Sequence, residues 1–204
     1  MLDSNFRDPY QKVLINPILK LKFIQKIDPN LVTILSTFFG VFSFFLIILN
    51  RKYLAVFTLL ISGYLDTLDG SIARISKKKS SIGSVLDIFS DRIVEMLIIV
   101  ALFLVDPIER SFLSILMISS SYLCITSFLV VAIFFQNSSE KSFYYSVGMI
   151  ERTEAFIFFI SMIVFYKYFK ILALTFSVLV FLTAFIRVFE FLKFYKQKKL
   201  KKEF

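Results

Sequence analysis

Four aspartates in this 204-residue chain have the type and spacing that metal-dependent chemistry requires. Asp66 and Asp69 are three residues apart, and Asp87 and Asp91 are four residues apart, so each pair lies on one face of a helix. Both pairs adjoin apolar segments, and an ionised side chain at the centre of a bilayer costs roughly 2.5–3.5 kcal/mol. The carboxylates therefore need a cationic partner. Their hard oxygen atoms suit magnesium, manganese or calcium, whereas a chain with no histidine and one cysteine offers few zinc ligands.

The residues between the two pairs indicate how the helices that carry them must meet. Segment 75–82 is short and contains three consecutive lysines. The helices that we predict on either side, 53–72 and 83–105, should therefore be antiparallel neighbours. The four carboxylates would then converge in a cleft near the membrane surface, where two metal ions can act together in a displacement at phosphorus.

The complete pattern, Asp-x2-Asp-Gly-x2-Ala-Arg-x8-Gly-x3-Asp-x3-Asp, resembles the signature of the CDP-alcohol phosphotransferase family, and residues 66–91 fill each of its positions. Members of that family are integral membrane enzymes, most with six transmembrane helices. They transfer a phosphate-linked alcohol from a CDP-activated donor to an acceptor hydroxyl and release CMP. The resemblance implies that Asp66, Asp69, Asp87 and Asp91 hold two divalent cations, Mg²⁺ or Mn²⁺. It also makes Asp91 the base that deprotonates the acceptor.

The same resemblance implies a pocket for the cytidine diphosphate part of the donor. It is expected to comprise Asn30, Thr33, Asp66, Asp69, Gly70, Ala73, Arg74, Ser80 and Gly83. The glycines would let the backbone approach the ligand closely. Asn30 is equally well explained as the cap of a helix that Pro29 starts.

Three cations are candidates for binding the acceptor: Lys141, Arg152 and Arg187. The sequences around the two arginines resemble the branch of the family that uses inositol phosphate, although that branch often has a further arginine where this chain has Ala155. A structural explanation stays open for both arginines. Arg152 can pair with a neighbouring glutamate, and Arg187 with Glu190.

The composition excludes an ordinary soluble domain. Hydrophobic residues make up 57% of the chain, and several runs of 18 or more residues are nearly free of charge. The net charge of +9 is expected to report membrane topology and anionic lipid, without nucleic acid as a partner. The first 30 residues lack the order of a cleavable signal peptide.

We predict an all-α integral membrane protein in three parts. Residues 1–30 form a cytoplasmic or interfacial segment with an amphipathic helix, for which packing on a partner protein is the alternative. Residues 31–195 form the six-helix domain, and residues 196–204 a basic cytoplasmic tail. The predicted spans are 31–50, 53–72, 83–105, 111–135, 155–166 and 171–194.

The distribution of lysine and arginine predicts the orientation of these spans. With both termini on one side, the opposite side holds only Arg51, Lys52, Arg110, Lys167 and Lys170. The termini and the aspartate cleft are therefore expected in the cytoplasm, in the plasma or inner membrane if the protein is bacterial.

These observations predict a metal-dependent phosphatidyltransferase of phospholipid synthesis. The expected donor is CDP-diacylglycerol, and the acceptor a small polar alcohol, phosphorylated like inositol phosphate or glycerol 3-phosphate. Another CDP-alcohol donor, or serine or inositol as acceptor, is the alternative within this chemistry. A cation-coupled transporter is the alternative from a different class, although its carboxylates would be expected near the midplane of repeated helices. The resemblance also implies a homodimer.

Overall fold

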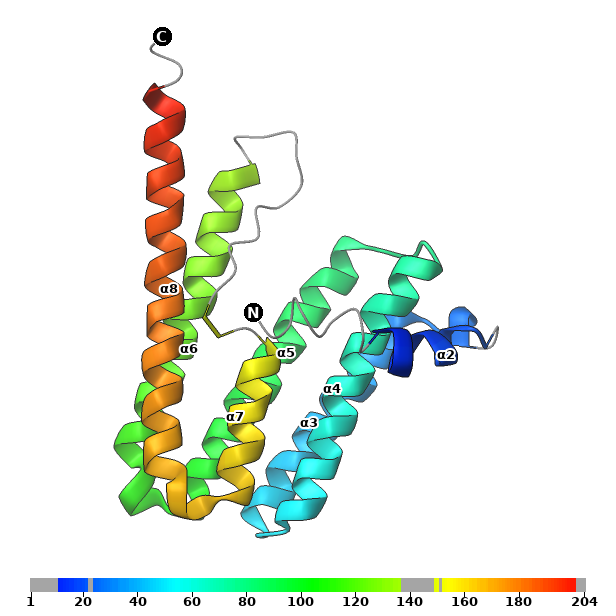
Figure 1. The fold of residues 1–204 in the computed structure, drawn as a ribbon. Helices are drawn as coiled ribbons and strands as arrows, with labels where there is room; N and C mark the ends of the chain where they lie inside the picture. Colours follow the sequence, from blue (N-terminus) through cyan, green and yellow to red (C-terminus); the bar gives the residue numbers. More distant parts are fainter. Residues whose placement is uncertain (1–10, 22–23, 137–148, 151, 201–204) are drawn as a thin grey trace.

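The computed structural model describes residues 11–21, 24–136, 149–150 and 152–200, and within these residues every regular element is a helix. Six longer helices succeed one another along the chain and run in alternating directions (Figure 1). They are α3 (Pro29–Ile48), α4 (Lys52–Ile75), α5 (Ser81–Val105), α6 (Pro107–Gln136), α7 (Arg152–Val164) and α8 (Phe169–Leu200). Short helical turns precede α3 and α8: η1 (Gln11–Ile15), α2 (Asn16–Leu19), η2 (Ile24–Lys26) and η3 (Tyr166–Tyr168).

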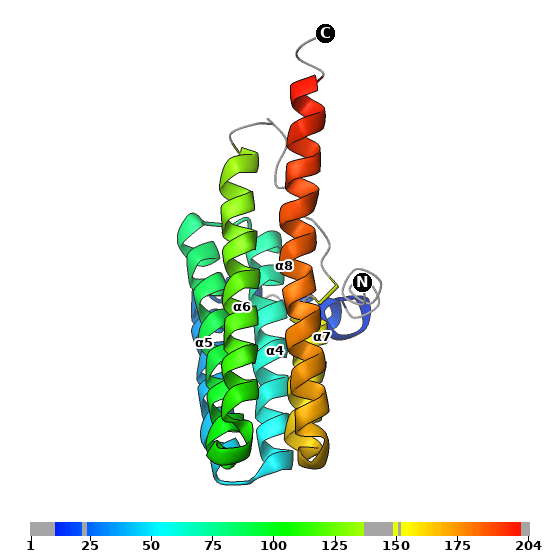
Figure 2. The ribbon, with the colours of Figure 1, turned by 90° about the vertical axis from the view of Figure 1, so that its left-hand side faces the viewer.

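The longer helices are aligned along one axis, and α6 and α8 extend beyond the others at one end (Figure 2). Helix α3 packs against both α4 and α5, while α6 packs against α8. The main core contains fully buried side chains from several helices, among them Ile47, Leu59, Ile98, Met162 and Phe176. Burial of these side chains stabilises the arrangement of the helices. Helices α3, α4 and α5 in turn carry most of the residues of the candidate site described below.

Two glycines allow helices to approach closely. A Cβ atom at Gly40 of α3 would collide with the side chain of Val94 on α5. A Cβ atom at Gly63 of α4 would come within 2.8 Å of the Phe156 ring on α7. Small residues at such contacts are typical of helices that pack within membranes.

Three helical segments are long and apolar enough to cross a membrane among the residues that the structure describes, namely 29–48, 107–134 and 166–197. Helices α4 and α5 have 24 and 25 residues, but they carry the charged residues of the aspartate motif. Helix α7 has only 13 residues. The three apolar segments agree with three of the six predicted spans, and the other three spans stay predictions.

The N-terminal segment differs from the predicted amphipathic helix. In residues 11–21 and 24–28 the helical turns are short and are interrupted after Leu19. Ile15 and Leu19 are buried against Leu68 and Ile72 of α4. The apolar side chains of this segment therefore pack against α4. Pro17 lies in the first turn of α2, where a proline is tolerated, and the helical residues end at Leu19, two residues later.

The start of α3 corrects a second prediction. The helix is capped by Asp28, whose carboxylate accepts a hydrogen bond from the Asn30 N–H at 3.0 Å. Asn30 lies inside the first turn, so its interpretation as the helix cap was wrong. Its side chain is left to contribute to the neighbouring cavity described below.

Candidate active site

Helices α4 and α5 bring the aspartate pairs together because a tight turn joins them. At the end of α4, Lys77 adopts a left-handed conformation with φ 56°, and the Lys78 N–H donates to the Ala73 carbonyl at 3.1 Å. This hydrogen bond is typical of a Schellman motif, which ends a helix. Ser80 then caps α5 by accepting a hydrogen bond from the Gly83 N–H at 3.0 Å. The last turns of α4 consequently face the first turns of α5.

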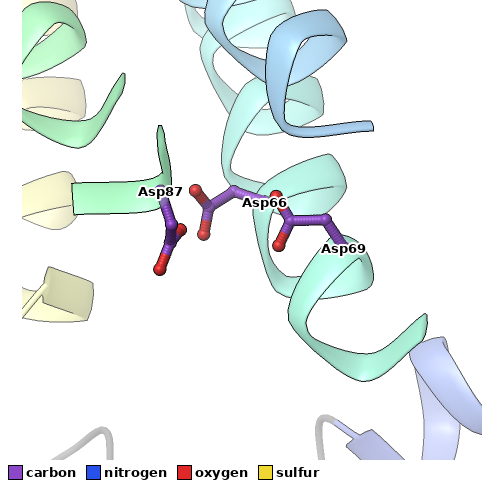
Figure 3. Close-up of side chains that lie close together, drawn as sticks. All are labelled: Asp66, Asp69 and Asp87. Carbon is purple, nitrogen blue, oxygen red and sulfur yellow. The ribbon is translucent and has the colours of Figure 1, made fainter. Parts of the chain in front are cut away.

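Asp66, Asp69 and Asp87 form a compact carboxylate group, and Figure 3 shows the first two on one helix with the third on its neighbour. One carboxylate oxygen from each lies within 4.8 Å of the others. Asp66 and Asp69 are buried, and Asp87 is half-buried. The Thr33 hydroxyl on α3 donates to Asp69 Oδ2 at 2.5 Å, so a third helix fixes the orientation of this group.

The carboxylate group fits a divalent metal ion. Oxygen atoms that coordinate Mg²⁺ at about 2.1 Å lie up to about 4.2 Å apart across the ion. The observed limit of 4.8 Å is close to this value, and small rotations of side chains can supply the difference. The donors are all carboxylate oxygens, which Mg²⁺ and Mn²⁺ prefer.

Asp91 lies outside this group of three and pairs with Arg152. Arg152 Nη2 is 2.5 Å from Asp91 Oδ1, and the same guanidinium forms an ion pair with Asp66. Arg152 is the first residue of α7, so α7 contributes a cation to the carboxylates of α4 and α5. The sequence alone suggested a glutamate close to Arg152 in the chain, whereas the fold brings it to two distant aspartates.

A cavity of about 270 Å³ lies on one side of the carboxylates. Among its lining residues are eight of the nine that were predicted to bind the nucleotide: Asn30, Thr33, Asp69, Gly70, Ala73, Arg74, Ser80 and Gly83. The ninth, Asp66, lines the neighbouring cavity instead. Lys78 and Lys79 also line this smaller cavity, so its wall carries several positive charges.

The two glycines of the predicted nucleotide pocket differ in how much space surrounds them. A Cβ atom at Gly83 would lie 3.0 Å from Asn30 Oδ1 and 3.2 Å from Ser80 Oγ, which is a tight contact. A Cβ atom at Gly70 would come no closer than 3.6 Å, to Arg74 Nη1. Gly83 is therefore the position where a side chain would disturb the cavity wall.

A larger cavity of about 400 Å³ lies on the other side of the carboxylates, lined among others by Asp66, Asp91, Arg152 and Arg187. Asp87 lines both cavities, so the two spaces meet at the carboxylate group. The third predicted acceptor residue, Lys141, lies outside the described residues.

Arg187 is held against α6. Its Nη1 atom donates to the Cys124 carbonyl at 3.0 Å and contacts Ser127 Oγ at 3.4 Å. The guanidinium lies over the Phe128 ring, 5.3 Å from its centroid. These contacts fix a cation in the wall of the larger cavity.

Two further charged residues in that wall, Arg92 and Glu95 of α5, were not identified by the sequence analysis. They form an ion pair with each other. The signal that could have found Glu95 is its position, four residues after Asp91 on the same helix face, inside an otherwise apolar predicted span.

The fold and the site together define an all-helical protein with membrane-length apolar helices and a carboxylate group suited to a divalent metal ion. A family model described as CDP-alcohol phosphatidyltransferase matches residues 26–189. The chain therefore belongs to the CDP-alcohol phosphatidyltransferase family, whose members are membrane-embedded transferases that typically use divalent metal ions. The chain also resembles an uncharacterized protein of Aquifex aeolicus (strain VF5), with 35% identity over 95 residues. Those residues are 46% of this chain and 48% of that protein, so the match spans about half of each.

Proposed function

We propose that this protein transfers a phosphatidyl group from CDP-diacylglycerol to the hydroxyl of a small polar alcohol that carries a phosphate, with release of CMP. The observation that carries this proposal is the meeting of two cavities at one carboxylate group. A transferase needs two substrates on opposite sides of the reacting phosphorus, and this arrangement provides a separate space for each.

The smaller cavity would bind the cytidine diphosphate part of the donor. Arg74, Lys78 and Lys79 give it positive charge for the two phosphates. Arg74 Nη2 donates to Ser71 Oγ at 2.8 Å, which orients the guanidinium. The glycine at position 83 keeps the wall free of a side chain beside Asn30.

The divalent ions, which we propose to be two Mg²⁺ or Mn²⁺ ions held by Asp66, Asp69, Asp87 and Asp91, would polarise the pyrophosphate and neutralise the charge that develops on CMP. Thr33 keeps the Asp69 carboxylate in one orientation through its hydrogen bond. This contact would hold one of the proposed ligand carboxylates in place before the substrates bind.

The larger cavity would bind the acceptor, and Asp91 would take the proton from its hydroxyl. Asp91 faces this cavity together with Arg152 and Arg187. A guanidinium has five N–H donors, so Arg152 can bind a phosphate while it keeps a contact to a carboxylate. Lys141 is retained as a weaker candidate for the same phosphate.

The surface of the helices supports a membrane location for this reaction. Ile82, Val85 and Phe89 on α5 are each more than 60% exposed, which suits contact with lipid or with the acyl chains of the donor. We further propose six spans, with the site and both termini in the cytoplasm, and the division at residues 1–30, 31–195 and 196–204. A homodimer is proposed from the family resemblance.

The experiment that tests this function measures CMP release by the purified protein in lipid nanodiscs. The protein is supplied with CDP-diacylglycerol, Mg²⁺ and one acceptor at a time: inositol phosphate, glycerol 3-phosphate, inositol or serine. Release with a phosphorylated acceptor, abolished by a chelator and restored by Mg²⁺, is the expected result. The absence of release with each acceptor, together with no binding of CDP-diacylglycerol, would contradict the proposal and favour the transporter.

A further inference from the structure

Glu95 is a carboxylate in the wall of the larger cavity that has no part in the proposed transfer step. It follows Asp91 by one helical turn on α5, and both side chains line the same cavity. The Glu95 side chain is 15% exposed. An acidic side chain inside an apolar span is costly, so its presence calls for a specific role.

Two neighbours fix the Glu95 carboxylate. The Ser121 hydroxyl on α6 donates to Oε1 at 2.6 Å, and Arg92 pairs with Oε2. An ionised carboxylate has about four lone-pair positions for hydrogen bonds. Each oxygen therefore keeps capacity to accept a further hydrogen bond from a molecule in the cavity.

The charges around the cavity restrict which part of a ligand can lie beside Glu95. Three arginines line this cavity, and Arg92 pairs with Glu95 itself, which leaves Arg152 and Arg187 as the cations that suit an anionic group such as a phosphate. A phosphate next to Glu95 would be repelled by a like charge. The part of the ligand that contacts Glu95 must instead donate hydrogen bonds, as the hydroxyl groups of a polyol do.

We propose that Glu95 is a specificity-determining residue, which accepts hydrogen bonds from hydroxyl groups of the acceptor alcohol other than the one that reacts. Ser121 and Arg92 are positioning residues for its carboxylate. The inference rests on the proposed function, because it assigns the larger cavity to the acceptor. It adds that the acceptor carries at least two hydroxyl groups.

A purely structural role is the alternative explanation for Glu95. Its contact with Ser121 joins α5 to α6, so its loss could weaken the packing of the two helices. Such a role would lower stability and would affect both substrates alike. A role in acceptor binding would change the KM for the acceptor alone.

The test compares four proteins in nanodiscs with CDP-diacylglycerol and Mg²⁺: the wild type, Glu95→Gln, Ser121→Ala and Glu109→Gln. Glu109 is the matched control, because it is an exposed glutamate that pairs with Lys170 on the surface. CMP release is measured as a function of acceptor and of donor concentration, and thermal unfolding is measured on the same samples.

We expect Glu95→Gln to raise the KM for a hydroxyl-rich acceptor about tenfold, because the amide keeps only one acceptor oxygen and the charge that strengthens the hydrogen bonds is lost. The kcat and the KM for the donor should change by less than about twofold. Ser121→Ala should raise the acceptor KM less, since Arg92 still holds the carboxylate, and Glu109→Gln should match the wild type.

An unchanged acceptor KM in Glu95→Gln would overturn the inference. A parallel loss of donor affinity and thermal stability would overturn it in favour of the structural role, and an effect confined to serine would replace hydroxyl recognition by ammonium recognition. If Glu95→Gln does not fold, Ser121→Ala decides: a smaller rise confined to the acceptor KM supports the inference, and an unchanged acceptor KM overturns it. A wild type that releases no CMP with any acceptor contradicts the proposed function itself, which is a distinguishable result.

Discussion

At the scale of single residues, Asp91 is the most direct test of the chemistry. Substitution by asparagine keeps the size of the side chain and removes its ability to accept a proton at neutral pH. We expect Asp91→Asn to lower kcat by about 10²–10⁴-fold, while CDP-diacylglycerol still binds because the smaller cavity does not include Asp91. CMP release and equilibrium binding of the donor measure the two effects. Asp106→Asn, which alters a helix-capping aspartate beyond the site, is the control and should retain activity.

An Asp91→Asn protein with turnover close to that of the wild type would remove the assignment of this residue as base. A protein that loses donor binding together with turnover would show that Asp91 supports the site as a whole. Since Asp91 is paired with Arg152, thermal unfolding of the variant should be measured alongside.

Thr33 tests how the carboxylate group is oriented. Its hydroxyl donates to Asp69 Oδ2 from a neighbouring helix, and loss of such a partner typically lowers metal affinity 10–100-fold. We expect Thr33→Val to bind Mn²⁺ about tenfold more weakly, as measured by the electron paramagnetic resonance signal of the free ion. Thr175→Val on α8 is the matched control, because the Thr175 hydroxyl donates only within its own helix in the described contacts. Equal affinities of the two variants would contradict this role of Thr33.

At the scale of the elements, the contact between Gly40 and Val94 sets the distance between α3 and α5. Gly40→Ala places a methyl group against the Val94 side chain, so it should destabilise the protein by about 1–3 kcal/mol despite the higher helix propensity of alanine. The double variant Gly40→Ala with Val94→Ala should recover most of this loss, because it provides the space. Thermal unfolding in detergent gives the comparison, and a single variant as stable as the wild type would contradict a close contact here.

The two elements that carry the aspartates could be predicted from the sequence because their spacing is local. Positions three and four residues apart share a helix face whatever surrounds them, and a short lysine turn leaves little choice of connection. The cap of α3 could not be assigned with the same certainty. Asp28 and Asn30 are both good capping residues. The backbone conformation of the folded protein distinguishes them, because Asp28 is extended and the helix begins at Pro29.

The partners of the arginines could not be predicted, because they depend on contacts between helices that are distant in the chain. Arg152 reaches Asp66 and Asp91 only once α7 packs beside α4 and α5. Glu95 likewise becomes part of the site through the larger cavity, which residues from each of the helices α3 to α8 line. Sequence spacing identified the carboxylates for the metal, and the tertiary fold added the residues around the acceptor.

At the scale of the whole molecule, the two ends of the helical bundle differ in how they hold their positive charges. At the end with the turns α3–α4 and α7–α8, several cations have partners within the protein. Arg110 donates to the Leu102 carbonyl at 3.0 Å, Lys170 pairs with Glu109 at 2.6 Å, and Lys52 lies over the Tyr166 ring. The α4–α5 turn, with its exposed lysines, and the C-terminal part of α8, which carries the exposed Lys193 and Lys196, lie toward the opposite end (Figure 1).

This asymmetry predicts the orientation of the protein, because lysines and arginines near the ends of spans are retained on the cytoplasmic side. Helix α8 has 32 residues and is therefore about 48 Å long, which exceeds the roughly 30 Å of hydrocarbon. Its basic end should emerge into the cytoplasm.

A single cysteine at Lys196 or at Lys167, in a chain with Cys124→Ser, allows the two ends of the helical bundle to be compared. In intact cells we expect a membrane-impermeant maleimide to label Lys167→Cys and to leave Lys196→Cys unlabelled until the cells are opened. The reverse pattern would place the carboxylate group on the outer side of the membrane, away from CDP-activated lipids that are made in the cytoplasm. That result would contradict both the topology and the proposed donor.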